Sequence, residues 1–125
     1  RRLTANFLVM DALTLANLPN RFDTVIDSGL FHVFSDDDRQ RYVDGLASVL
    51  KPGGRFYLLC FSDDEPGTIG PRRVSEDEIR ATFANGWQIQ SIKRSRYEVR
   101  PDPYDPSFKD GGPKAWFVVV SRVVT

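Results

Sequence analysis

The sequence has little of two reactive residue types, with one cysteine and one histidine among its 125 residues. A single cysteine excludes an intrachain disulfide framework and a zinc site built from cysteines. It also leaves Cys60 and His32 as the only residues that could form a cysteine–histidine nucleophile pair. No apolar run approaches the roughly 20 residues that a membrane-spanning helix needs.

Net charge is also absent, because 17 Lys and Arg residues balance 17 Asp and Glu residues. This balance gives no electrostatic reason to expect nucleic acid or an anionic membrane as a partner. The hydrophobic fraction of 41% and the charged fraction of 27% are ordinary for a globular domain. We therefore expect one soluble, cytoplasmic domain with neither a nucleic-acid partner nor a membrane partner.

Three short apolar runs, each bounded by turn-forming residues, predict buried strands. They lie at residues 7–10, 24–26 and 56–61. Near-continuous apolar runs of this kind are typical of a parallel sheet that is covered on both faces. The sequence therefore predicts an α/β fold.

A capped helix is predicted between the second and third runs. Ser35 is the expected N-cap, with Asp38 three positions later. Apolar residues then recur at helical spacing as far as Leu50, and the Lys-Pro-Gly-Gly segment at residues 51–54 ends the helix and turns the chain. We interpret the acidic residues 36–38 as a helix N-terminus rather than as metal ligands, so we expect no metal site. Strand, helix and strand together predict a βαβ unit.

The C-terminal third predicts one more helix and two strands. The helix starts at Ser75, with Glu78 completing a capping box, and runs to Gly86. Two strands follow at residues 87–99 and 116–124, and a shift of phase in the first of them suggests a bulge. Because a Pro-rich loop without a helix joins them, we expect the two strands to be antiparallel neighbours.

Polar residues directly follow two of the predicted strands. Asp11 comes after the first strand, and residues 27–29, Asp-Ser-Gly, come after the second, with His32 shortly beyond. In open α/β sheets, ligands bind in the crevice outside the carboxyl ends of the strands. We therefore expect these residues to line one ligand site.

Two segments of the chain resemble the fourth and fifth strands of class I S-adenosylmethionine-dependent methyltransferases. They are Phe-Asp-Thr-Val-Ile-Asp at residues 22–27 and Leu-Lys-Pro-Gly-Gly-Arg-Phe-Tyr-Leu at residues 50–58. Residues 27–32 and 70–75 are similar to the small-molecule branch of this family, which includes thiopurine, thiol, halide and tellurite methyltransferases.

The resemblance implies a Rossmann-like class I methyltransferase fold with the sheet order 3-2-1-4-5-7-6. Strands 3 to 7 would be present, with an antiparallel pair at the C-terminal end. Strands 1 and 2, together with the family's Gly-rich cofactor loop, would precede Arg1 and be missing. Residues 1–125 would then be the C-terminal part of a methyltransferase domain, and the strand at residues 7–10 would have no neighbour in the sheet.

The resemblance also implies S-adenosylmethionine as the cofactor and S-adenosylhomocysteine as its product. Asp11 would accept a hydrogen bond from the adenine amino group, and the Ala12 N–H would donate to the adenine ring, with Leu13 beside them. The residues beside the methionine part of the cofactor would be Asp27, Ser28 and Gly29. The alternative for Asp11 is a cap of a helix or turn, and for Asp27 it is a turn residue.

Four residues lie where the resemblance places the methyl acceptor. They are Phe31, His32, Arg72 and Arg73, although for Phe31 we favour a position in the wall or core over specific recognition of the acceptor. His32 is the one candidate for a general base, since its ordinary pKa of about 6.5 suits that role, whereas a structural role is the common alternative for a lone histidine. The two arginines could bind an anionic group or simply be solvated.

The leading functional hypothesis is methyl transfer from S-adenosylmethionine to a small-molecule acceptor, for which a thiol needs the least help from a base. We expect the 125-residue chain alone to be inactive. The alternatives are a catalytically silent methyltransferase-like domain that binds a ligand or a partner, and a Rossmann-like oxidoreductase. An exposed strand edge could also pair between chains and form a homo-oligomer. We expect Cys60, Trp87 and Trp116 in the core.

Overall fold

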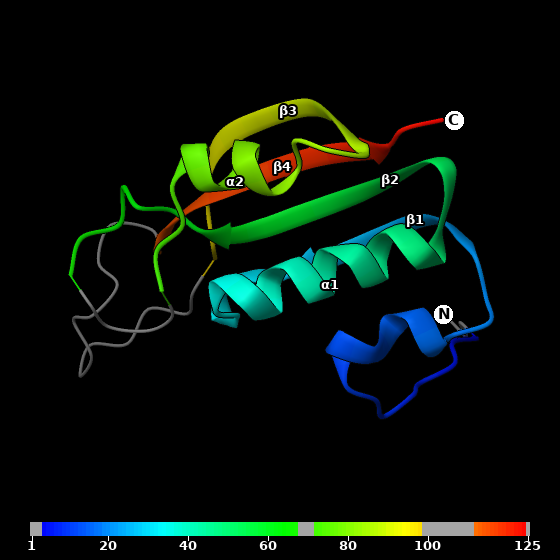
Figure 1. The fold of residues 1–125 in the computed structure, drawn as a ribbon. Helices are drawn as coiled ribbons and strands as arrows, with labels where there is room; N and C mark the ends of the chain where they lie inside the picture. The colour runs from blue at the N-terminus through cyan, green and yellow to red at the C-terminus, as the bar shows by residue number, and fades with distance from the viewer. Residues whose placement is uncertain (1–3, 68–71, 99–111, 125) are drawn as a thin grey trace.

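The computed structural model describes residues 4–67, 72–98 and 112–124 of the chain. These residues form a four-stranded sheet with two α-helices on one of its faces (Figure 1). In chain order the elements are the 3-10 helix η1 (Ala12–Asn17), β1 (Phe22–Ser28), the 3-10 helix η2 (Phe31–Val33), α1 (Asp36–Val49), β2 (Leu50–Phe61), α2 (Glu76–Thr82), β3 (Trp87–Arg96) and β4 (Lys114–Arg122). Among the described residues, no helix is long and apolar enough to cross a membrane.

The strands lie side by side in the order β1-β2-β4-β3. β1 and β2 are parallel and are connected through α1, which confirms the predicted βαβ unit. β4 pairs antiparallel with both β2 and β3, which confirms the predicted antiparallel pair. The register of β3 shifts between Ile89 and Ser91, where the sequence pattern changes phase. Most of the predicted Pro-rich loop lies outside the described residues.

Both α-helices begin at the predicted side-chain caps. The Ser35 hydroxyl accepts a hydrogen bond from the Asp38 N–H at 3.3 Å, and Ser75 forms a reciprocal capping box with Glu78. These bonds satisfy amide groups that a helix N-terminus otherwise leaves without a partner. The α2 helix ends at Thr82, earlier than predicted, and the positive φ of 84° at Gly86 lets the chain reverse into β3.

The prediction of a strand at residues 7–10 is wrong for this structure. The segment has no regular structure, and the Phe7 side chain is 93% exposed. An apolar run becomes a strand only where a neighbouring strand accepts its hydrogen bonds and covers its side chains. In the described sheet, β1 pairs with β2 alone, and no strand lies at its other edge. The segment at residues 7–10 therefore pairs with none of the described strands.

Glycines allow two close approaches of the backbone. A Cβ atom at Gly45 of α1 would lie 3.0 Å from the Leu15 Cβ, so glycine lets η1 pack closely against the helix. A Cβ atom at Gly54 would lie 2.8 Å from the Lys51 carbonyl oxygen, which is too short for any side chain. This second glycine belongs to the Lys-Pro-Gly-Gly segment, which leads from α1 into the paired part of β2.

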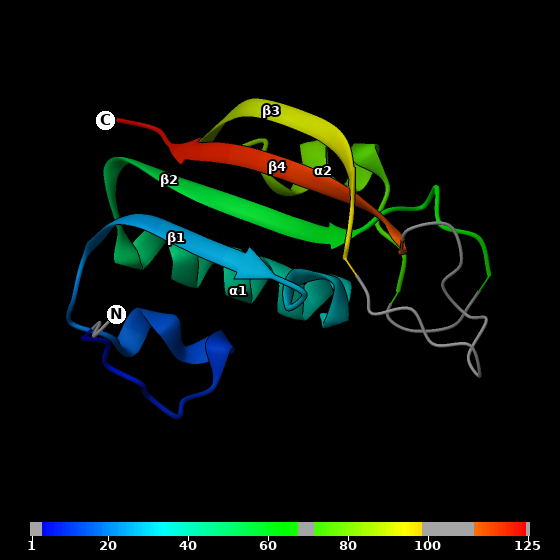
Figure 2. The ribbon, with the colours of Figure 1, turned by 180° about the vertical axis from the view of Figure 1, so that it is seen from behind.

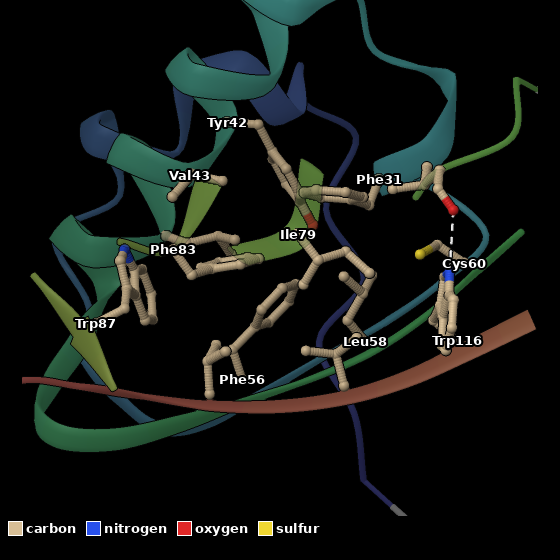
Figure 3. Close-up of a cluster of buried hydrophobic side chains, with 14 of the residues drawn as sticks. Phe31, Tyr42, Val43, Phe56, Leu58, Cys60, Ile79, Phe83, Trp87 and Trp116 are labelled. Atoms are coloured by element: carbon tan, nitrogen blue, oxygen red, sulfur yellow. Dashed lines mark hydrogen bonds between the residues drawn. The ribbon is translucent and has the colours of Figure 1, made fainter. Parts of the chain in front are cut away.

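The hydrophobic core lies between the sheet and its two helices. Figure 3 shows side chains from β2, β4, α1 and α2 that meet there. The Trp116 indole N–H donates to the Val74 carbonyl at 2.9 Å, which satisfies its one polar group. Cys60 is fully buried in this core, and burial raises the pKa of its thiol to about 12. The predicted core positions of Cys60, Trp87 and Trp116 are confirmed.

No described helix or strand covers the other face of the sheet (Figure 2). Along each strand the side chains alternate between the two faces. Ile26 of β1 is 76% exposed and Phe117 of β4 is 37% exposed, whereas their strand neighbours Asp27 and Val118 are buried. The sequence pattern predicts a sheet that is covered on both faces. Among the described residues, helices cover one face only (Figure 2).

Candidate functional site

The carboxyl end of β1 is held by the Asp27 side chain. Asp27 is 5% exposed, and each of its carboxylate oxygens accepts one hydrogen bond. Oδ1 accepts from the Leu30 N–H at 2.9 Å, and Oδ2 accepts from the Tyr42 hydroxyl of α1 at 2.7 Å. The carboxylate therefore points into the fold and fixes the turn that follows the strand.

The solvent side of this turn is formed by Ser28 and Gly29. Ser28 is exposed, and Gly29 adopts a φ of 94°, in the left-handed region that side chains other than glycine rarely occupy. The Gly29 N–H donates to the Leu59 carbonyl of β2 at 3.1 Å. The turn thus presents a hydroxyl and bare backbone to solvent, which suits close approach by a ligand.

His32 lies behind this turn and is 5% exposed. Its Nδ1 accepts a hydrogen bond from the Phe61 N–H at 2.9 Å, so in the neutral ring the proton is on Nε2. The ring also lies edge-on to the aromatic rings of Phe61 and Tyr97, with centroids 5.1 Å and 6.2 Å away. Burial lowers the pKa of His32 below 6.5, although the Asp27 charge and a backbone hydrogen bond with Gly29 oppose this shift. This environment favours a neutral histidine that ties the turn to the end of β2.

The stability of the chain should depend on pH through this histidine. We expect acidification from about pH 7.5 to about pH 5.5 to lower Tm, and His32→Asn to remove most of this dependence. The unfolded chain binds a proton near the ordinary pKa of 6.5, whereas the folded chain resists protonation. The contribution of neutral His32 is therefore complete above that pH and is lost as the pH falls below it.

Thermal unfolding followed by circular dichroism at both pH values checks this expectation. His32 is the only histidine, so no other side chain ordinarily titrates in this range. The asparagine variant keeps an oxygen that can accept the Phe61 N–H. An equal drop in Tm for both proteins would contradict the prediction.

The two arginines of the predicted acceptor side point in different directions. Arg72 donates to the Asp36 carboxylate at 2.9 Å and to the Phe34 carbonyl at 2.8 Å, and so holds the start of α1. This ion pair lowers the pKa of Asp36. The Arg73 guanidinium lies 5.0 Å from the centre of the Phe61 ring and donates to backbone carbonyls of its own loop. Arg72 and Arg73, although adjacent in the sequence, therefore do not form one joint anion site.

The structure does bring His32 and Arg72 to one place. Both contribute to an open depression, which is lined by His32, Val33, Phe34, Ser35, Asp36 and Arg72. Phe31, in contrast, has no exposed surface, because it stacks on Phe83 in the core with ring centroids 6.0 Å apart. This position leaves Phe31 no surface for contact with a substrate.

Asp11 lies apart from the β1 turn in the chain and caps η1. Its Oδ1 accepts from the Leu13 N–H at 2.9 Å, which is the capping role that an aspartate often takes. Ala12 and Leu13 are half-buried against the core. In Figure 2, η1 lies beside α1, beyond the edge of the sheet that β1 forms.

Sequence reasoning missed the roles of two tyrosines. Tyr42 fits the apolar spacing of α1, so its hydroxyl bond to Asp27 was not foreseen. Tyr97 follows β3, packs against Phe61 and His32, and donates from its hydroxyl to the Leu59 carbonyl. The available signal was chemical, since a buried tyrosine hydroxyl usually needs a hydrogen-bond partner.

Comparison with known proteins identifies the family. The family model described as thiopurine S-methyltransferase matches residues 4–112. The chain belongs to the thiopurine S-methyltransferase family. Its membership places it among S-adenosylmethionine-dependent methyltransferases and confirms the resemblance found in the sequence.

Curated relatives of this family are about one third identical to the chain. The 2-heptyl-1-hydroxyquinolin-4(1H)-one methyltransferase of Mycobacteroides abscessus is 32% identical over 108 residues, which are 85% of this chain and 46% of that protein. The thiopurine S-methyltransferase of Bos taurus is 32% identical over 83 residues, which are 66% of this chain and 34% of that protein. The chain therefore spans less than half the length of these two relatives.

Solved structures agree with the methyltransferase fold. A structure from work on the conversion of a disulfide bond into a thioacetal group during echinomycin biosynthesis has a TM-score of 0.73 and 32% identity. The match covers 97% of this chain and 57% of that one. An S-adenosylmethionine-dependent methyltransferase from Methanosarcina mazei has a TM-score of 0.74 at 14% identity, covers 98% and 69% of the two chains, and shows the fold alone.

Proposed function

We propose that the protein transfers a methyl group from S-adenosylmethionine to a small-molecule acceptor, with a thiol as the leading acceptor class. The family match over residues 4–112 carries this proposal. The cofactor supplies a methyl group already activated on sulfonium, so the protein has to align donor and acceptor and exclude water. We also propose a cytoplasmic location, in line with a single cysteine that is buried and free.

Two short segments would hold the cofactor. The exposed Asp11 carboxylate can accept from the adenine amino group, and the Ala12 N–H, in the first turn of η1, can donate to the ring. Ser28 and the backbone of Gly29 would lie beside the methionine part. Asp27 would act through the turn that it holds, because its own oxygens are already bonded inside the fold. The geometry of the turn fits the group, since no side chain at Gly29 blocks it.

We propose that the described sheet corresponds to four of the seven strands of the family's sheet. We assign β1, β2, β3 and β4 to the fourth, fifth, sixth and seventh strands, because the order β1-β2-β4-β3 matches 4-5-7-6. The open edge of β1 is then the place of the first strand. Residues 7–10 would form the third strand of the family's sheet only where the second strand is present to pair with them. On this assignment residues 1–125 form a partial domain, and the 125-residue chain alone does not bind the cofactor tightly.

The surroundings of His32 support a thiol acceptor. A general base needs a free lone pair, whereas the Nδ1 lone pair of His32 accepts the Phe61 N–H and Nε2 carries the proton. A thiol, with an ordinary pKa of about 8.5, ionises appreciably near neutral pH without a dedicated base. A hydroxyl acceptor does not ionise appreciably at this pH without a base. We therefore expect His32→Asn to leave turnover at neutral pH unchanged, which would exclude a general-base role, whereas a clear loss of turnover would support one.

Calorimetry with S-adenosylmethionine tests the function. We expect the complete polypeptide that carries this chain to bind at micromolar concentration, and the 125-residue chain to show no binding in this range. A panel of matched thiol, hydroxyl and amine acceptors with radiolabelled cofactor should then give methylated thiol. No cofactor binding by the complete polypeptide would refute the proposal. Binding without transfer to any acceptor would favour a silent domain instead.

A further inference from the structure

Tyr42 connects the crossover helix α1 to the end of β1. Its side chain is 3% exposed, and its hydroxyl donates to the Asp27 Oδ2 at 2.7 Å. The Tyr42 ring packs against Phe34 and Phe56, with centroids 4.8 Å and 6.5 Å away, so its direction is fixed by the core. Figure 3 shows Tyr42 and Phe56 in this core. Burial and the Asp27 charge raise the pKa of Tyr42, which keeps the hydroxyl protonated and able to donate.

The bond from Tyr42 decides which way the Asp27 carboxylate faces. Among the described residues, this hydroxyl is the only donor to Oδ2, while Oδ1 accepts from the Leu30 N–H. Without the hydroxyl, one oxygen of a buried carboxylate would lack a partner, and the side chain would gain by turning toward water. That rotation would release the Leu30 N–H and loosen the turn that presents Ser28 and Gly29.

We propose that Tyr42 is a positioning residue of the cofactor site, acting through Asp27 to set the backbone of residues 28 and 29. This inference rests on the proposed function, since it concerns the same turn. Tyr42 itself touches no ligand, because it is buried on the core side of the sheet. Its hydroxyl keeps the turn at residues 28 and 29 in its binding conformation before the cofactor binds.

The test compares Tyr42→Phe with Tyr57→Phe in the complete polypeptide that carries this chain. Tyr57 lies on the same sheet, but its ring stacks on Phe117 on the other face. We expect Tyr42→Phe to weaken S-adenosylmethionine binding about tenfold, as expected for a lost hydrogen bond to a charged group. The KM for the cofactor should rise similarly, and kcat at saturating cofactor should change little. Tyr57→Phe should change none of these values.

Hydrogen exchange gives a readout that does not need the cofactor. The amides of Gly29 and Leu30 should exchange faster in Tyr42→Phe than in the wild type, and amides of β4 should not. Unchanged binding and unchanged exchange would overturn the positioning role while leaving the function standing. Failure of the wild type to bind the cofactor would instead overturn the proposed function and this inference together.

A double-mutant cycle with Asp27→Asn separates positioning from general loss of stability. If Tyr42 acts through Asp27, the effects of the two substitutions on cofactor affinity should be clearly less than additive. Full additivity would overturn the proposed route. The cycle is measured below the unfolding temperature of the least stable variant. Every variant is then folded, and its cofactor affinity can be measured even where its Tm is reduced.

Discussion

Asp27→Ala is expected to lower the free energy of unfolding by about 3 kcal/mol, because one buried and one partly buried donor lose their acceptor. These donors are the Tyr42 hydroxyl and the Leu30 N–H, at 2.7 Å and 2.9 Å from the carboxylate. The Tyr42 hydroxyl cannot reach water easily, since Tyr42 is 3% exposed, and Asp27 itself is 5% exposed. Urea denaturation of the chain, followed by circular dichroism, measures this effect.

Asp23→Ala is the matched control, because it removes an aspartate from the same strand. The Asp23 side chain is 83% exposed, and its ion pair with Lys51, at 3.4 Å, is open to solvent. Exposed pairs of this kind contribute at most about 1 kcal/mol, so a small effect is expected. Equal destabilisation by the two substitutions would show that the buried carboxylate does not organise the end of β1.

Phe56→Ala is expected to lower the free energy of unfolding by about 4 kcal/mol, as is typical for removing a fully buried aromatic ring. Phe56 has no exposed surface and lies between the rings of Tyr42 and Phe83, with centroids 6.5 Å and 6.1 Å away. It thereby joins β2 to both helices (Figure 3). Its loss would leave a cavity where three elements meet.

Phe117→Ala removes the same ring from the other face of the sheet. Phe117 is 37% exposed and stacks on Tyr57, with centroids 6.4 Å apart, so about 1 kcal/mol is expected. Chemical denaturation of both variants measures the difference. Similar losses of stability would contradict the placement of the core on the helix-covered face alone.

At the end of β1, the proposed cofactor site offers a ligand more backbone than side chain. Asp27 and His32 look from the sequence like residues that meet a ligand, yet both make their hydrogen bonds inside the fold. What they leave on the surface is the turn at Ser28 and Gly29. Such a turn suits a cofactor that brings its own activated methyl group and needs mainly to be positioned.

The βαβ unit and the C-terminal strand pair could be predicted because their signals are local. A cap such as Ser35 acts on an amide three residues away, and the strand patterns repeat every second residue. The apolar run at residues 7–10 carries a similar local signal but forms no strand, because pairing needs a second strand that lies elsewhere in the chain or fold.

The sequence by itself determined the α/β fold class and the family, and it predicted the two segments that we propose hold the cofactor. Only the tertiary structure decided where their side chains point. Tyr42 reaches Asp27 across 15 residues, and the Phe61 amide reaches His32 across 29. Patterns in a sequence report periodicity along the chain, whereas the direction of a buried polar group is set by whichever distant donor or acceptor meets it in the folded core.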